Sequence, residues 1–236
     1  MEIRCLGSSS KGNCYLLVGK SETLILEAGV PFFEVKKALG FNLSSIVGAL
    51  VTHKHKDHAK SIVNLLQNGI KTISTKEAFE KGSPFAIIGQ SKKGIQLGNF
   101  KIIPLAVCHD CECFGYLIQH PECGKLGFFT DTYDIPFIIP QLDYLMIESN
   151  YSKKILDENL YSGKIHGALR ERIIHSHYSF DNALLKIKEQ RNLNAVVLLH
   201  LSKENSDGEE FISRTERETG IPTYAAHNGF TLKLSA

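Results

Sequence analysis

Short apolar runs alternate with stretches of helical periodicity along the 236 residues of the chain. The apolar runs are bounded by turns rich in glycine, serine and asparagine, which is typical of β-strands. Strands are predicted over residues 3–6, 15–18, 23–26, 46–51, 72–74, 100–105, 114–118, 126–130, 144–147, 195–199, 223–225 and 230–234. Because they occur in both halves of the chain, we expect a β-rich framework throughout.

Apolar residues spaced three and four apart predict helices between these strands. Helices are predicted over residues 31–39, 57–66, 152–159, 162–173, 179–191 and 208–219, with Ser179 as an N-cap. Strands in both halves with helices outside them predict an α/β fold in which two mixed sheets pack face to face, in the four layers α/β/β/α. No linker or low-complexity segment interrupts the pattern, so residues 1–236 are expected to form one domain.

Composition is ordinary for a globular α/β chain, with 43% hydrophobic and 22% charged residues. No apolar run approaches the roughly 20 residues of a membrane span, and the N-terminus lacks the order of a signal peptide. We therefore expect a cytoplasmic protein without a membrane partner. The net charge of +2 neither demands nor excludes nucleic acid, so any basic surface must be local.

The segment Thr52–His58 places three imidazoles and one carboxylate directly after the apolar run 46–51. Alternate residues of an extended segment share a face, so His53 and His55 can point at one ion. Asp57 and His58, at the entry of the next helix, can point at a neighbouring ion. Four such side chains at the end of a buried strand are costly unless something binds them. The segment therefore predicts a metal site rather than a polar loop.

Three further polar residues each end an apolar run: His109, Asp131 and His200. With the first segment they make five histidines and two aspartates. Seven such ligands suffice for two metals that share one bridging carboxylate, with room for a water between them. Imidazole and carboxylate suit zinc, and manganese or iron fits a carboxylate-bridged pair almost as well.

The six cysteines are expected to be free thiols, because no signal for export precedes them. They are Cys5, Cys14, Cys108, Cys111, Cys113 and Cys123. A zinc cluster in residues 108–113 is disfavoured, since only one residue separates Cys111 from Cys113 instead of the usual two to four. Half-buried thiols near an active-site loop are the preferred interpretation.

The order Thr-His-x-His-x-Asp-His, a lone histidine, Thr-Asp-Thr and a strand-end histidine resembles the metallo-β-lactamase fold superfamily over nearly the whole chain. The resemblance implies two sets of metal ligands that share a bridging carboxylate. One set is His53, His55 and His109, the other is Asp57, His58 and His200, and the bridge is Asp131. It also implies that Asp57 orients or deprotonates the attacking water.

Four segments resemble, more narrowly, the YycJ-like (VicX/WalJ) group of single-domain exonucleases: residues 7–13, 148–151, 177–179 and 199–205. This resemblance implies a dinuclear-metal phosphodiesterase or nuclease acting on DNA or RNA. Hydrolysis of another ester, such as a thioester, a lactone or a small cyclic phosphate, remains an alternative. A metal-binding regulator without catalysis is the third interpretation.

A glutamate after the bridging aspartate, followed by a later His-x-Ser, also resembles the tRNA 3′-processing endonucleases. This implies that Glu148 orients His177, which contacts the scissile phosphate or protonates the leaving oxygen. Such a histidine suits the role because its pKa lies near physiological pH and a carboxylate partner sets its tautomer. His175 is the rival, and the match at Ser179 favours His177.

Two positions depart from the family pattern. Glu27 stands in Leu-Glu-Ala-Gly where Asp-x-Gly is usual, so its longer side chain is expected to alter the support of the metal loop. His227 precedes Asn228-Gly229, a hairpin signal, and is expected to fill a turn. Of the basic residues near the motifs, only Lys203 is expected to contact a phosphate backbone.

Overall fold

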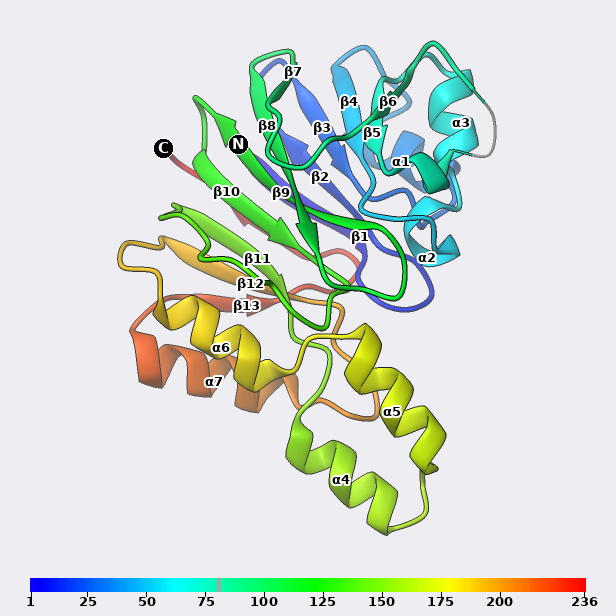
Figure 1. Cartoon of the computed structure of the whole chain (residues 1–236). Coiled ribbons are helices and arrows are strands. Elements are labelled where there is room, and N and C mark those ends of the chain that lie inside the picture. Colours follow the sequence, from blue (N-terminus) through cyan, green and yellow to red (C-terminus); the bar gives the residue numbers. More distant parts are fainter. Residues whose placement is uncertain (80–81) are drawn as a thin grey trace.

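Two seven-stranded sheets pack face to face in the computed structural model, which describes residues 1–79 and 82–236 (Figure 1). In sheet order, the first consists of β14 (Thr231–Lys233), β1 (Glu2–Gly7), β2 (Cys14–Val18), β3 (Thr23–Leu26), β4 (Ile46–Leu50), β5 (Thr72–Ser74) and β6 (Ala86–Ile88). The second consists of β13 (Thr223–Ala225), β12 (Ala195–Leu199), β11 (Tyr144–Glu148), β10 (Gly124–Phe129), β9 (Cys113–His120), β8 (Phe100–Val107) and β7 (Ile95–Leu97).

Both sheets are mixed. In the first, β14, β1, β2 and β3 pair antiparallel, whereas β3 to β6 pair parallel. In the second, β7 to β10 pair antiparallel and β10 to β13 pair parallel. Because the carboxyl ends of neighbouring parallel strands meet at one edge of a sheet, the loops after β4, β10 and β12 are brought to the same side of the molecule.

Helices cover the outer faces of the sheets and complete the predicted α/β/β/α layers (Figure 1). α1 (Phe32–Ala38), α2 (Lys56–Ala59) and α3 (Ile62–Gln67) lie on the first sheet, with a short 3₁₀ turn at Lys76–Ala78. α6 (Phe180–Lys188) and α7 (Gly208–Thr219) lie beneath β11 to β13. α4 (Lys153–Tyr161) and α5 (Gly167–Ser176) form a pair that projects from the body. In the described part of the chain, no helix is long and apolar enough to cross a membrane.

The main core lies between the sheets, where alternate strand residues meet. Leu26 and Leu50 of the first sheet and Phe100, Tyr116 and Phe128 of the second are fully buried there. Each sheet also has one outer core, between it and the helices that cover it. A small separate core lies between α4 and α5. Alternate strand residues face the other sheet, and β2, β3, β11 and β12 are buried along almost their whole length because helices cover their outer faces.

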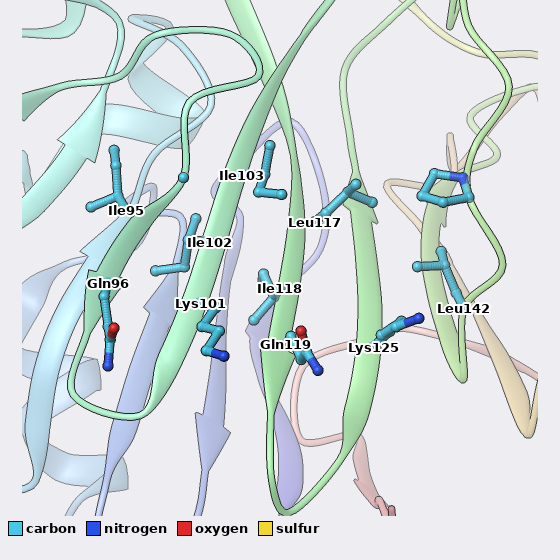
Figure 2. Close-up of a pocket in the computed structure, with 12 residues that line it drawn as sticks. Ile95, Gln96, Lys101, Ile102, Ile103, Leu117, Ile118, Gln119, Lys125 and Leu142 are labelled. Carbon is cyan, nitrogen blue, oxygen red and sulfur yellow. The ribbon is translucent and has the colours of Figure 1, made fainter.

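The helices α6 and α7 do not cover the outer face of β7 to β10 (Figure 1). This face carries an apolar pocket of about 470 Å³ (Figure 2). Ile95, Ile103 and Leu117 line it, with Lys101 and Lys125 among the polar residues. The pocket shares no residue with the cavity that contains the sequence-predicted ligands.

The structure departs from the predicted elements mainly at short edge strands and at one helix start. β6 and β7, three-residue strands at the edges of the sheets, were not expected. The helix predicted over 162–173 is wrong at its start: α4 runs on to Tyr161, and α5 begins only at Gly167. Gly163 has a φ of 76°, a left-handed conformation that interrupts the helical path. The N-cap prediction for Ser179 is confirmed, since its hydroxyl accepts from Asn182 N at 3.3 Å.

Candidate metal centre

All seven sequence-predicted ligands lie together at the edge where the loops after β4, β8, β10 and β12 converge. A cavity of about 510 Å³ opens onto five of them: His55, Asp57, His109, Asp131 and His200. The remaining two, His53 and His58, are fully buried beneath it.

The Thr52–His58 segment is held by close backbone packing. His55 has extended dihedrals and forms the N-cap of α2, so Asp57 and His58 lie in its first turn, as expected. The carbonyl of Asp57 accepts from Asn13 N at 2.8 Å, and that of His58 accepts from Ala28 N at 2.7 Å. A Cβ on Gly29 would lie 1.7 Å from Asp57 O, so only glycine permits this approach.

His53, His55 and His109 form the first group of candidate ligands. His109 Nε2 lies 3.3 Å from His55 Nδ1, and the His53 ring centroid lies 4.6 Å and 4.7 Å from the centroids of His55 and His109. Two nitrogens bound to a tetrahedral zinc at 2.0–2.1 Å lie about 3.3–3.4 Å apart. The spacing of this pair therefore already fits two ligands of one ion.

The second group surrounds Asp131. Asp131 Oδ2 lies 3.2 Å from His58 Nε2, and Asp131 Oδ1 lies 2.9 Å from His200 Nδ1. Asp57 Oδ2 lies 3.4 Å from His58 Nε2 and 4.0 Å from His200 Nε2. Asp131 also shares a cluster with His53 and His58 in which the ligand atoms lie within 4.8 Å of one another. This central carboxylate is placed as a bridge between two ions would be.

Buried polar atoms without partners support the fit of metal ions here. His53 Nδ1 is occupied by Thr52 Oγ1 at 2.9 Å, but His53 Nε2 is buried without a hydrogen-bond partner among the described residues. Such an atom is costly unless something binds it. Asp131 and His200 also have left-handed backbones, with φ of 26° and 53°, a conformation that is uncommon for non-glycine residues.

Carboxylates control the protonation of the buried imidazoles. Burial alone would lower the pKa of His200, but Asp131 and Glu148 outweigh burial and raise it to about 10. The same balance, with Asp131 and Glu27 as the main carboxylates, raises the pKa of His58. Burial would raise the pKa of Asp131, and the contacts with His200 and His58 lower it instead. Divalent cations bound among these groups would displace the protons, since ligating imidazoles must be deprotonated.

Glu148 and His177 meet beside this cluster. His177 Nδ1 lies 2.7 Å from Glu148 Oε1, while Glu148 Oε2 accepts from the backbone N–H groups of Thr132 and Tyr178 at 3.0 Å each. Burial would lower the pKa of His177, but Glu148 outweighs it and raises that pKa. The structure thus brings together the pair that the sequence proposed. Their ligand atoms also cluster with Asp131 and His200 within 4.8 Å, so a metal-binding role for His177 has to be tested.

The rival histidine lies elsewhere. The side chain of His175 is 70% exposed, its Nδ1 lies 2.8 Å from the carbonyl of Glu171, and it does not line the cavity. His227 is likewise outside the site: it is exposed, and its Nδ1 lies 3.0 Å from Asn228 O. The turn interpretation of His227 is confirmed.

Glu27 supports the metal loop from behind. It is fully buried, its Oε2 lies 3.4 Å from His58 Nδ1, and its Oε1 accepts from Thr52 N at 3.3 Å. The longer side chain therefore still reaches the loop, and Glu27 has a left-handed backbone with a φ of 68°. Burial raises the pKa of Glu27 despite the contact with His58.

Ion pairs separate the basic residues into two kinds. Lys54 pairs with Glu77 at 2.6 Å, and Arg170 pairs with Asp157 at 2.8 Å. By contrast, Lys203 and Arg172 form no ion pair within the described residues, and both line a second cavity that adjoins the first. Lys203 was expected there, whereas Arg172 had no distinguishing signal in the sequence.

Two more residues at the centre were not expected as participants. Asn13 Nδ2 lies 3.1 Å from His58 Nε2, although asparagine in a glycine- and serine-rich turn gives no signal of such a role. The Cys111 thiol lies within 4.8 Å of the ligand atoms of His53, His55 and His109. All six cysteines are free thiols.

Comparisons with known proteins indicate the family and the fold. Residues 9–79 match the family model of the metallo-beta-lactamase superfamily. A comparison with curated protein sequences gives no match.

Solved structures are similar over the whole chain. The metallo-beta-lactamase fold protein YhfI from Bacillus subtilis has 17% identity and a TM-score of 0.74 over 98% of both chains. A diphosphatase from the PhnP family has 16% identity and a TM-score of 0.68, covering 100% of this chain and 98% of that one. The short form of human tRNase Z has 12% identity and a TM-score of 0.61 over 100% of both chains. The chain therefore has the metallo-β-lactamase fold, and the match over residues 9–79 supports its place in the metallo-β-lactamase superfamily.

Proposed function

We propose that the protein is a dinuclear-metal phosphodiesterase, and specifically a nuclease of the exonuclease-like type. The observation that carries this proposal is the Glu148–His177 pair, joined at 2.7 Å beside the aspartate proposed to bridge the metals. Hydrolysis of a phosphodiester needs a nucleophile, charge neutralisation and an acid for a poor leaving group. Two divalent ions, zinc or alternatively manganese or iron, would activate a water and offset the phosphate charge.

The residues of the chain divide the remaining tasks. His53, His55 and His109 would hold one ion, Asp57, His58 and His200 the other, and Asp131 would contact both. Asp57 is also proposed to orient the attacking water, because its carboxylate lines the cavity and is 24% exposed. The leaving group still needs an acid, and the side chains proposed for that task are not among the seven metal ligands.

His177 is proposed as the general acid. Its Nδ1 is held by Glu148, which leaves Nε2 as the nitrogen able to give a proton to a leaving oxygen. The side chain lines both cavities and is 19% exposed, so a substrate can reach it. Glu148, fully buried and bonded to two backbone N–H groups, is a positioning residue.

A nucleic-acid substrate is supported by the second cavity, of about 480 Å³. It shares Ser10, Arg172, His177 and His200 with the first, so the two are continuous. Lys11, Arg172 and Lys203 line it with one carboxylate, Glu204, which leaves a positive balance beside the scissile position. Such a path suits a phosphate backbone that extends beyond the bond being cut. The PhnP-family diphosphatase and tRNase Z, which share the fold, act on phosphate compounds according to their names.

The proposal is tested by a substrate screen on protein whose metal content is known from elemental analysis. We expect cleavage of end-labelled DNA or RNA oligonucleotides in zinc or manganese. Turnover of bis-p-nitrophenyl phosphate without oligonucleotide cleavage would contradict the nuclease and leave a phosphodiesterase. Turnover of a thioester or lactone alone would contradict both the nuclease and the phosphodiesterase proposals. With two metals bound and no ester hydrolysed, a metal-binding regulator would be the better interpretation.

Arg172→Ala is expected to raise KM for an oligonucleotide by about 10- to 100-fold with a smaller change in kcat. A hydrogen bond to a charged group contributes roughly 1.5–3 kcal/mol, and 1.4 kcal/mol corresponds to tenfold. The salt dependence of KM should also weaken, because one phosphate contact is lost.

Arg170→Ala is the matched control on the same helix, since its guanidinium is paired with Asp157 at 2.8 Å and Glu171 at 3.0 Å. Steady-state kinetics at several salt concentrations measure both variants. Equal effects of the two substitutions, or a loss confined to kcat, would argue against a phosphate contact by Arg172.

A further inference from the structure

A thiol lies among the first group of histidines. Cys111 Sγ lies within 4.8 Å of one ligand atom each from His53, His55 and His109. These three atoms also lie within 4.8 Å of one another. The cysteine is half-buried, as is the cavity-facing His55. This placement differs from a surface thiol, because three imidazoles face it at once.

The loop that carries Cys111 is anchored at both ends. At its start, Cys108 N donates to Asp134 O at 3.0 Å, and at its end Phe114 N donates to Thr52 O at 3.1 Å. The second anchor joins the loop directly to the segment that carries His53. Residues 109–111 bend between these anchors, and the Cys111 thiol lies within 4.8 Å of a ligand atom of His109. The backbone therefore holds the thiol near the histidines.

A second cysteine shows which side of His53 faces the candidate ion. Cys113 Sγ lies 3.7 Å from His53 Nδ1, the nitrogen that also contacts Thr52 Oγ1 at 2.9 Å. Cys113 thus lies behind the ring. The other nitrogen, Nε2, is buried without a hydrogen-bond partner in the described part of the chain, and it is the atom free to bind an ion together with Cys111.

We propose that the Cys111 thiolate is a further protein ligand of the ion held by His53, His55 and His109, in addition to the bridging Asp131. The resulting donor set, three imidazoles, the bridging carboxylate and one thiolate, consists of side chains that bind zinc in proteins. Thiolate selects zinc over manganese, so this position is the zinc-specific one of the two.

Asp110 is the competing donor. Its Oδ1 lies 3.2 Å from His109 Nε2 and 3.4 Å from His55 Nε2, but the side chain is 53% exposed. A carboxylate and a thiolate give different optical signatures with cobalt, which often replaces zinc. Cobalt can therefore distinguish the two donors without any measurement of activity.

The experiment is titration of metal-free protein with Co²⁺, followed by near-ultraviolet absorption and elemental analysis. We expect a thiolate-to-cobalt charge-transfer band in the unmodified protein. Cys111→Ser should abolish the band and weaken zinc binding by more than about tenfold, the effect expected from loss of a group at the metal. Cys108→Ser, a half-buried thiol in the same loop, is the matched control and should keep the band, as should Asp110→Asn.

This inference rests on the metal centre proposed above, and the two can fail separately. Unmodified protein that binds no metal would remove the centre itself. Bound cobalt without the band, or a band that persists in Cys111→Ser, would overturn only the role of Cys111. Loss of the band in Cys108→Ser would also contradict it, because that result would assign the thiolate to a different cysteine.

Discussion

Replacing His177 with alanine is expected to lower the rate of phosphodiester hydrolysis by ~10²–10⁴ without loss of metal, the range typical of removing a general acid. The physical reason is the pairing of His177 Nδ1 with Glu148 at 2.7 Å, which presents Nε2 to the cavity. The effect should fall with a better leaving group, since p-nitrophenolate needs little protonation. Initial rates on an oligonucleotide and on a p-nitrophenyl ester, with metal content measured in the same samples, give the comparison.

His175→Ala is the control for His177, because that side chain is exposed and lies outside the cavity. It should leave both rates unchanged. Glu148→Gln should reduce the oligonucleotide rate less than His177→Ala does, because the amide still accepts a hydrogen bond but no longer stabilises the protonated imidazole. If His177→Ala loses an ion, His177 is a ligand instead, as its closeness to Asp131 and His200 allows.

Replacing Asp131 with alanine is expected to remove both ions and all hydrolytic activity. Its two oxygens lie 2.9 Å from His200 Nδ1 and 3.2 Å from His58 Nε2, and it also clusters with His53 within 4.8 Å, so one side chain lies near the candidate ligands of both ions. Without it, imidazoles remain together in a buried site that lacks its central negative charge. Metal stoichiometry by elemental analysis is the measurement, and circular dichroism checks that the chain is folded.

Asp134→Ala provides the comparison for Asp131. Asp134 lies in the same loop. Its backbone carbonyl accepts hydrogen bonds from Cys108 N at 3.0 Å and from Thr132 Oγ1 at 2.7 Å. This variant should retain two ions and full activity. A folded Asp131→Ala protein that still holds two ions would exclude Asp131 as the bridge.

Most of the fold could be predicted because each long element carries its own periodicity. The strand Ala195–Leu199 and the helix Gly208–Thr219 have the predicted bounds, and the layered arrangement of two mixed sheets is confirmed. The errors concern features without such a signal. β7 is an edge strand that, among the described residues, pairs with residues 100–102 of β8, and the delayed start of α5 follows from the left-handed Gly163.

The candidate site likewise contains residues that the sequence could indicate and residues that it could not. The segment Thr52–His58 predicts metal binding because four ligand-type side chains lie within six positions of the sequence. His109, Asp131 and His200 could be placed only through their positions at the ends of apolar runs and the family resemblance. Cys111 was interpreted as an ordinary thiol, since its spacing to Cys113 fits no structural zinc motif. Its three histidine neighbours include two that lie more than 50 positions earlier in the chain.

The sequence by itself determined the layered α/β class, the residues able to bind metal and the candidate acid with its carboxylate. The class follows from local periodicity and the candidate ligands from residue type and position, which do not depend on distant contacts, whereas the candidate acid and its carboxylate were implied by the family resemblance. Only the tertiary structure decided that Glu148 meets His177 rather than His175, and that Arg172 remains unpaired while Arg170 is neutralised. It also placed Cys111 beside three histidines. Such contacts depend on how the two sheets bring their loops to a common edge, and no local pattern records that packing.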